Sequence, residues 1–428
     1  MKDSNAQCQK SADKLNILCG QSTYELQTDF PVDLLGASGS YALLDDEGIK
    51  RALDECVYSE SYSDCVERAE KILFILPDIT RKSGLERFFP SMLAEAEKHG
   101  KAVSIIFAVG THRAVTEDEK KKILGDAVYS KYKDRLFDHD CEDLTAHAFY
   151  GITKSKTPVF INKIYLEHDL IVPIGSVSHH YFAGYGGGRK LIFPGIAAKK
   201  SILRNHMLAL DASGGRRHPL AKAGELNHNP VHRDIVDALM ISRSGHNFFS
   251  VNTVLDEQGR LLDMVCGDLF MAHHKACEVL DSRFRITPAG KYRSLIVSCG
   301  GFPKDINMVQ AQKSLDRAAP VAEEGADIFF FAECADGSGN SFFRDFFDLP
   351  SSKAMLESLL TDYQINRQTA YNLRTLTERF NVYLFSSFSE AECARMGFKK
   401  LHSPSDMLPL LRPGETAFIP SAYSFLFG

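Results

Sequence analysis

Short, nearly unbroken apolar runs recur along this chain, and they constrain its fold more than any other feature. The six clearest runs lie at residues 71–77, 101–109, 169–175, 294–299, 327–332 and 381–385. Runs of this length are typical of parallel strands that helices cover on both faces. Amphipathic stretches with helical spacing separate them, for example at residues 90–99, 117–124, 305–318 and 351–360. The alternation predicts an α/β protein with mainly parallel sheets.

The alternation stops at a polar, basic stretch near residues 283–293 and then restarts. A chain of 428 residues is long enough for two domains. We therefore predict a larger N-terminal domain at residues 1–285 and a smaller C-terminal α/β domain at residues 286–405, with the active site in the cleft between them. The tail at about residues 406–428 is predicted to pack back on the N-terminal domain.

Composition and charge argue against several classes of protein. The net charge is −5 with acidic and basic residues interspersed, which argues against a nucleic-acid surface or a polybasic membrane anchor. No apolar run approaches the roughly 20 residues of a membrane span, and the first residues lack the apolar core of a signal peptide. The ten cysteines form no Cys-x-x-Cys pair, so we expect reduced thiols rather than a disulfide framework. These features predict a cytoplasmic protein.

The densest group of reactive side chains lies between residues 178 and 206. It contains, in order, His179, His180, Gly184, Gly186, Gly187, Gly188, Arg189, Lys190 and His206. Histidine exchanges protons or binds metals near neutral pH, clustered glycines let backbone amides close on an anion, and lysine binds phosphate or forms covalent bonds. Adjacent histidines in an extended chain point in opposite directions, so we expect only one of the first two to face a site.

Polar groups also follow the ends of the predicted strands. Asp78-Ile79-Thr80-Arg81 follows the first apolar run, and Gly110-Thr111-His112 follows the second. Ligands of open α/β sheets bind outside the carboxyl ends of the strands, so we expect these groups to meet His180 in one crevice. Simpler interpretations remain for each motif, with Asp78 as a helix cap and His112 as a loop histidine before a capped helix.

Further along the chain, Gln310 and Lys313 share a face of a predicted helix. Together they are able to receive a carboxylate, although a solvated helix face is the alternative. Two histidine pairs are interpreted as structural or surface residues. They are His228 with His232, which Pro230 separates, and His273 with His274.

Taken in order, these motifs resemble the nickel-dependent lactate racemase family. They are Asp78-Ile79-Thr80-Arg81, Gly110-Thr111-His112, the run from His180 to Lys190 with Phe193-Pro194-Gly195, Asn205-His206, and Gln310 with Lys313. The resemblance implies a larger N-terminal and a smaller C-terminal α/β domain. It also implies a nickel-pincer nucleotide, a nickel-bound pyridinium-3,5-bisthiocarboxylate mononucleotide that separate biosynthesis proteins make.

The resemblance assigns a role to each matching residue. Lys190 would attach the cofactor covalently, and His206 would be the protein ligand of nickel. The segment Asp78, Ile79, Thr80 and Arg81 would hold the nucleotide, with Gly187 and Gly188 giving it room. His112 and His180 would be the catalytic acid/bases, and Gln310, Lys313 and Arg81 would contact the substrate. The implied activity is racemisation or epimerisation of a small 2-hydroxy acid by hydride transfer to and from the cofactor.

The chain also departs from the family pattern. It contains no tryptophan, whereas lactate-specific members use one beside the substrate, and this weakens the case for lactate. His179 and Arg344 have no assigned role. Two alternatives stay open: a zinc hydrolase that uses His112, His180 and His206, which leaves Lys190 unexplained, and a non-catalytic nickel or nucleotide carrier.

Overall fold

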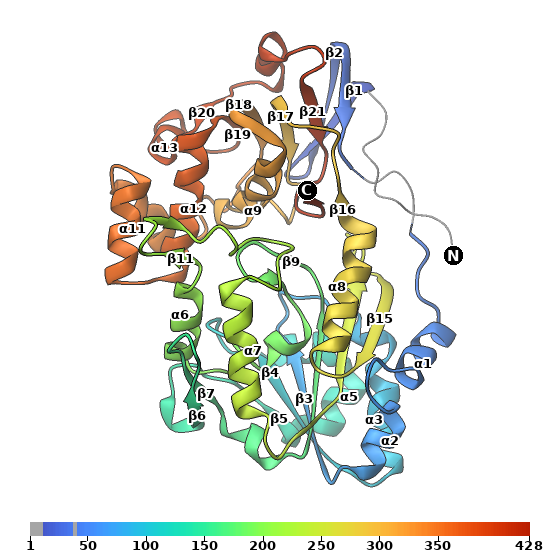
Figure 1. The fold of residues 1–428 in the computed structure, drawn as a ribbon. Helices are drawn as coiled ribbons and strands as arrows, with labels where there is room; N and C mark the ends of the chain where they lie inside the picture. The colour runs from blue at the N-terminus through green and yellow to red at the C-terminus, as the bar shows by residue number, and fades with distance from the viewer. Residues whose placement is uncertain (1–11, 37–40) are drawn as a thin grey trace. The chain divides into compact units, whose positions relative to one another are not determined.

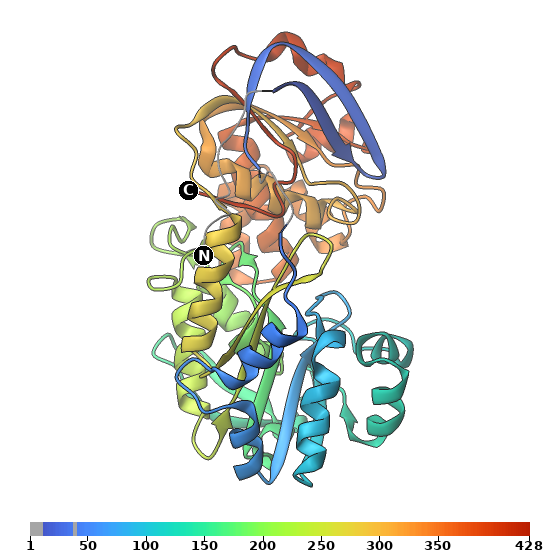
Figure 2. The same ribbon diagram turned by 90° about the vertical axis from the view of Figure 1, so that its right-hand side faces the viewer.

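The structure, a computed structural model, describes residues 12–36 and 41–428, and contacts along the backbone divide the chain into two units (Figure 1, Figure 2). Unit 1 comprises Met1–Gly39, Leu210–His218 and Asp281–Gly428, and unit 2 comprises Ser40–Ala209 and Pro219–Leu280. Each unit combines helices with a mainly parallel sheet, which confirms the predicted α/β class. No helix in the described ranges is long and apolar enough to cross a membrane.

The main sheet of unit 2 has the strand order β15-β14-β8-β3-β4-β5. Its strands are β3 (Lys71–Pro77), β4 (Ala102–Ala108), β5 (Leu136–Phe137), β8 (Leu170–Ser176), β14 (Ser250–Leu255) and β15 (Leu261–Gly267). β15 pairs antiparallel with β14, whereas the other strands pair in parallel. Five consecutive side chains of β3, at 72–76, are fully inaccessible to solvent. This strand is therefore covered on both faces, as its apolar run predicted.

Helices connect these strands and cover the sheet. They are α1 (Asp46–Asp54), α2 (Tyr62–Arg68), α3 (Phe89–Lys98), α4 (Glu117–Leu124), α5 (Asp126–Tyr132), α6 (Lys199–Met207), α7 (Pro230–Ser242) and α8 (Met271–Phe284). α4 begins where the sequence predicted, because Thr116 and Glu119 form a reciprocal capping box. The loop that carries His112 therefore runs from the end of β4 to this cap at the start of α4.

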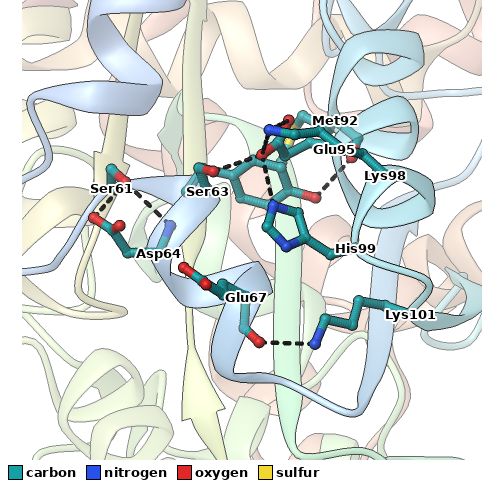
Figure 3. A network of polar contacts seen from close by, with 10 residues as sticks. Ser61, Ser63, Asp64, Glu67, Met92, Glu95, Lys98, His99 and Lys101 are labelled. Carbon is teal, nitrogen blue, oxygen red and sulfur yellow. Dashed lines mark hydrogen bonds and ion pairs between the residues drawn. The ribbon is translucent and has the colours of Figure 1, made fainter.

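Polar contacts join α2 to α3 beside the sheet (Figure 3). The Ser63 hydroxyl donates to Glu95 Oε1 at 2.5 Å, and the Tyr62 hydroxyl donates to the Met92 carbonyl at 3.0 Å. Tyr62 and Met92 also belong to the apolar core under β3. The contacts therefore join the helix that precedes β3 in sequence to the helix that follows it.

The sheet of unit 1 has the strand order β1-β2-β21-β17-β18-β19-β20. Its strands are β1 (Ala12–Cys19), β2 (Ser22–Leu34), β17 (Tyr292–Ser298), β18 (Ala322–Phe331), β19 (Asn381–Phe385), β20 (Lys399–Lys400) and β21 (Thr416–Ile419). Its helices are α9 (Met308–Ala318), α10 (Ser341–Asp345), α11 (Ser352–Thr361), α12 (Ile365–Arg379) and α13 (Glu390–Met396). The three strands predicted for the second half of the chain are all present.

Two assignments of the predicted domain limits need correction. β1 and β2, which fall inside the predicted 1–285 domain, form an antiparallel hairpin in the sheet of unit 1. The tail was predicted to pack on the N-terminal domain, but its strand β21 pairs with β2 on one side and β17 on the other. The physical reason is that β17 needs a hydrogen-bonding partner on its second edge, and the buried segment 416–419 supplies it.

The cysteines in the described part of the chain are all free thiols. Most are buried, and burial raises the pKa of thiols such as Cys56, to about 12. Such thiols are protonated and weakly reactive near neutral pH. Cys8 lies outside the described residues.

Candidate active site

Three loops of unit 2 leave neighbouring strands at the carboxyl edge of the sheet. Residues 78–81 follow β3, His112 follows β4, and the short strand β9 (His179–His180) follows β8. β3 lies between β4 and β8 in the sheet. The polar groups therefore follow the ends of adjacent strands, as predicted. Ligands of such sheets usually bind at this edge.

Asp78 and His112 form a hydrogen-bonded pair. Nδ1 of His112 lies 2.6 Å from Oδ2 of Asp78, while Oδ1 of Asp78 accepts the backbone N–H of Thr80 at 3.0 Å and its hydroxyl at 2.5 Å. Burial acts to raise the pKa of Asp78, but the hydrogen bonds from His112 and Thr80 outweigh it and hold the pKa below its ordinary value. The carboxylate therefore stays ionised, and its main observed role is to orient a histidine.

His112 and His180 present different tautomers when their rings are neutral. Nδ1 of His112 donates a hydrogen bond to the carboxylate of Asp78, so the neutral ring carries its lone pair on Nε2. In His180, Nδ1 accepts the backbone N–H of Ala183 at 3.2 Å, so the neutral ring carries its proton on Nε2. Nε2 of His112 is therefore able to accept a proton, whereas Nε2 of the neutral His180 ring donates a hydrogen bond.

The two adjacent histidines have different surroundings, as the extended chain predicted. His179 is buried and packs against Tyr185 at 5.4 Å between ring centroids. His180 is half-buried and packs edge-on against Phe182 at 4.6 Å. His179 therefore has a packing role in the β9–β10 turn, where β10 spans Gly184–Tyr185.

Lys190 and His206 both have a pKa below the ordinary value for their residue type. Burial and the positive charges of Arg81 and Arg189 lower the pKa of Lys190 well below its ordinary value. Burial and the charge of Lys190 lower the pKa of His206, on α6, to about 3. Nδ1 of His206 is buried and makes no hydrogen bond of standard geometry within the described residues. A neutral amine and a neutral imidazole are the forms that act as nucleophile and metal ligand.

The glycines of the motif are required by close packing. A Cβ on Gly184 would lie 2.0 Å from the Glu225 carbonyl oxygen, and one on Gly188 would lie 2.3 Å from Oδ1 of Asn252. Gly187 has φ of +81°, and a Cβ at this position would lie 2.7 Å from the Ser176 carbonyl oxygen. The absence of a side chain at these glycines lets the loop pack closely against β8 and β14. Contact of Gly187 and Gly188 with a nucleotide stays a prediction.

Sequence reasoning missed a buried cluster next to Lys190. The Arg189 guanidinium is 1% exposed, and it binds Nε2 of His273 and Nδ1 of His232, each at 2.5 Å. No carboxylate binds Arg189 in the part of the chain that the structure describes. Burial, together with the charges of Arg189 and Lys190, lowers the pKa of His232 to about 2, so it remains a neutral acceptor.

This cluster agrees with the interpretation of the two histidine pairs as structural or surface residues, and it shows what the structural members do. One member of each pair binds the same arginine from a distant helix. His232 comes from α7 and His273 from α8, while His228 is mostly exposed. The only sequence signal was the position of Arg189 directly before Lys190.

Gln310 and Lys313 belong to unit 1, where they lie on one face of α9 as predicted. Lys313 Nζ donates to Gln310 Oε1 at 2.6 Å, and Asn307 caps the helix. Arg344 pairs with its neighbour Asp345 at 2.7 Å and is 57% exposed, which fits a surface role. Among the residues with described positions, no three histidine, cysteine, aspartate or glutamate side chains gather as metal ligands. The three-histidine zinc site of the hydrolase alternative is therefore not formed.

The neutral buried histidines predict a loss of stability in mild acid. Burial lowers the pKa of His139 to about 4 from an ordinary 6.5, and that of His232 to about 2. As pH falls below about 6.5, these rings take up protons in the unfolded chain but not in the folded one, so unfolding becomes more favourable. Thermal melts from about pH 8 to about pH 4 should show the melting temperature falling before the carboxylates titrate.

A matched pair of variants isolates this effect. His139→Gln should flatten the acid dependence of the melting temperature, whereas His228→Gln, at an exposed position, should leave it unchanged. A melting temperature that is constant down to about pH 5 would contradict the assignment of neutral buried rings.

Known proteins resemble this chain over both units. Residues 33–216 match the lactate racemase N-terminal domain and residues 291–374 the lactate racemase C-terminal domain. The lactate racemase of Thermoanaerobacterium thermosaccharolyticum is 31% identical over 333 residues, covering 77% of this chain and 76% of that protein. The lactate racemase of Lactiplantibacillus plantarum is 28% identical over 347 residues, covering 80% and 77%.

Solved structures agree with this assignment. The lactate racemase apoprotein from Thermoanaerobacterium thermosaccharolyticum superposes with a TM-score of 0.84 at 25% identity, covering 97% of this chain and all of that one. A Thermotoga maritima protein at 19% identity shares the fold, with a TM-score of 0.67, and covers 91% of this chain and all of its own. The two domain matches, with a relative 31% identical over most of its length, show that this chain belongs to the lactate racemase family.

Proposed function

We propose that this protein is an isomerase that racemises or epimerises a small 2-hydroxy acid with the help of a nickel-pincer nucleotide. Its curated relatives are named lactate racemases, which sets the reaction class. The observation that carries the proposal to this chain is the pair of histidines at one sheet edge whose neutral rings have different tautomers, with Nδ1 of His112 bound to Asp78 and Nδ1 of His180 bound to a backbone N–H.

The residues of unit 2 fit the implied cofactor on two observations. Nδ1 of His206 is buried without a hydrogen bond of standard geometry in the described residues, so the ring retains coordinating capacity. Burial, Arg81 and Arg189 lower the pKa of the Lys190 amine, which favours the neutral form that covalent attachment requires. His206 would hold nickel, Lys190 would tether the nucleotide, and residues 78–81 would bind it. When bound, the cofactor supplies a reversible acceptor for the hydride of C2.

The protein's own residues then handle the proton and the carboxylate. Nε2 of His112 removes the hydroxyl proton, and the Asp78 carboxylate stabilises the imidazolium that forms. His180, entering as an imidazolium, gives a proton to the oxygen to form the other enantiomer and is left neutral, so the two rings exchange roles for the reverse reaction. Arg81, Gln310 and Lys313 are the proposed contacts for the substrate carboxylate. Two histidines are needed because the hydroxyl group occupies different positions in the two enantiomers.

The experiment that tests this proposal follows both configuration and isotope. The enzyme, produced together with the cofactor-making proteins, is incubated with single enantiomers of 2-hydroxy acids deuterated at C2, lactate included. We expect loss of optical purity with deuterium retained at C2, because the hydride returns to the carbon that released it. Attached cofactor without scrambling of any acid would favour the carrier alternative, and exchange of C2 deuterium with solvent would contradict hydride transfer.

A further inference from the structure

A cavity of about 490 Å³ in unit 2 adjoins the Asp78–His112 pair. Its lining comes from the loop after β3, which includes Asp78 and Arg81, and from the β14–β15 turn and α4. Apolar side chains cover part of the wall, among them Leu85, Leu261 and Ile123. The volume lies in the range of sites that enclose small ligands, and it is larger than a three-carbon acid fills.

The charges that line this cavity are unbalanced. Its basic side chains are Arg81, Lys82, Arg87, Lys122 and Arg260, and its acidic ones are Asp78 and Glu86. Arg87 pairs with Asp46 and Arg260 with Asp256, so both are compensated outside the lining. Asp78 is occupied by His112. Three cations therefore face the cavity against the single carboxylate of Glu86.

Two of those three cations have no protein partner. The side chains of Arg81 and Lys122 make no hydrogen bond or ion pair within the described residues. Lys82 makes one hydrogen bond, from Nζ to the Gln258 carbonyl at 3.0 Å, which leaves two N–H donors. Unpaired cations that line a concave surface attract and bind anions.

The lysine that lies over the β14–β15 turn is held by the backbone there. Gly259 has φ of +85°, and a Cβ at this position would lie 2.4 Å from Cδ of Lys82. The missing side chain gives space to the aliphatic stem of Lys82, and the Gln258 carbonyl fixes its ammonium. This placement reduces the conformational entropy that an exposed lysine otherwise loses when it binds a ligand.

We propose that Lys82 and Lys122, together with Arg81, form a subsite for an oxyanion, and that this oxyanion is the second acidic group of the 2-hydroxy acid substrate. The proposal rests on the proposed function. The substrate is the favoured source because the same cavity is lined by Asp78, which orients His112, and by Arg81, a proposed carboxylate contact. The phosphate of the nucleotide is the other source with this chemistry.

The test is calorimetric titration of the apoprotein, so it does not depend on loaded enzyme. The probes are lactate, the 2-hydroxy dicarboxylate malate, inorganic phosphate and nicotinic acid mononucleotide. We expect malate to bind at least about tenfold more tightly than lactate, with an advantage that shrinks as ionic strength rises. The double variant Lys82→Gln/Lys122→Gln should lose this advantage.

Lys121→Gln is the matched control. It removes the same charge from the next residue, which lies outside the cavity lining and near Asp118 at 4.0 Å, so the preference for malate should persist. Lys82 and Lys122 are exposed, and equal melting temperatures would show that the double variant is folded. The single variant Lys122→Gln, which removes no protein contact, repeats the test independently.

The outcomes separate the two sources and the two proposals. If the double variant weakens only phosphate and the mononucleotide, the oxyanion subsite stands and serves the cofactor. If it weakens no probe, the subsite is refuted. Loaded enzyme that racemises lactate and malate equally well would contradict the substrate assignment and leave the proposed function intact. Selective malate binding by the apoprotein, with no racemisation of any acid by loaded enzyme, would overturn the proposed function and the substrate assignment and leave the oxyanion subsite standing.

Discussion

Lys190→Ala protein, produced together with the cofactor-making proteins, will have the mass of the bare polypeptide, whereas the unaltered chain will carry a cofactor-sized adduct. The expected loss is complete, because the amine of Lys190 is the nucleophile that forms the bond. Burial, Arg81 and Arg189 all lower its pKa. The lowered pKa favours the unprotonated amine, which is the form that nucleophilic attack requires.

Lys199→Ala is the control for this result. Lys199 lies on α6 close in sequence to Lys190, but its hydrogen bond to Glu142 raises its pKa and keeps it protonated. Intact-mass measurement should show the adduct on the Lys199 variant. An adduct that survives in Lys190→Ala would place the attachment elsewhere. An unaltered chain that never gains an adduct and binds stoichiometric zinc would revive the hydrolase alternative.

His112→Ala and His180→Ala should each lower the rate of racemisation by about 10²- to 10⁴-fold, the usual contribution of a general acid or base. The measurement is loss of optical purity of a single enantiomer by enzyme whose adduct has been verified by mass. His228→Ala, at an exposed position, should retain full activity. A fully active His112 or His180 variant would remove that histidine from the mechanism.

Asp78→Asn distinguishes the orienting role of this carboxylate from nucleotide binding. Thr80 donates both its N–H and its hydroxyl to Oδ1, so the oxygen of an asparagine amide would remain there and its NH₂ would face His112. That NH₂ would donate to Nδ1 and force the ring proton onto Nε2, where the base needs a lone pair. We expect a rate loss as large as that of His112→Ala, with the adduct intact. Loss of the adduct instead would assign Asp78 chiefly to the nucleotide.

The sequence predicted the parts of the fold that depend on local pattern. β3, β4 and β8 are buried on both faces, and each appears within one residue of its apolar run. The hairpin β1–β2 was placed in the wrong domain because its alternating burial identifies a strand but not the strand's partner. β21 has only four residues, too few for a periodic signal to indicate its central place.

Some features of the candidate site could be predicted from the sequence, and others could not. Residues that follow strand ends could be predicted from position and residue type, and Asp78, His112 and His180 do lie after β3, β4 and β8; their roles stay predictions. Partnerships between distant segments could not. Arg189 binds histidines 43 and 84 residues away, and no local pattern reports that pairing. The glycines looked like an anion site in sequence, yet three of them are required by the close approach of neighbouring backbone and side-chain atoms.

The order of strands in unit 1 has a consequence for how the protein is made. β21 separates β2 from β17 in the sheet. The β1–β2 hairpin is synthesised first, but it cannot join β17, β18 and β19 until residues 416–419 have been made. The last segment of unit 2 ends at residue 280. Synthesis of unit 2 is therefore complete while unit 1 still lacks most of the strands of its sheet. A premature stop shortly before residue 416 would therefore leave a finished unit 2 beside a divided sheet, with two apolar strand edges exposed to chaperones and to aggregation.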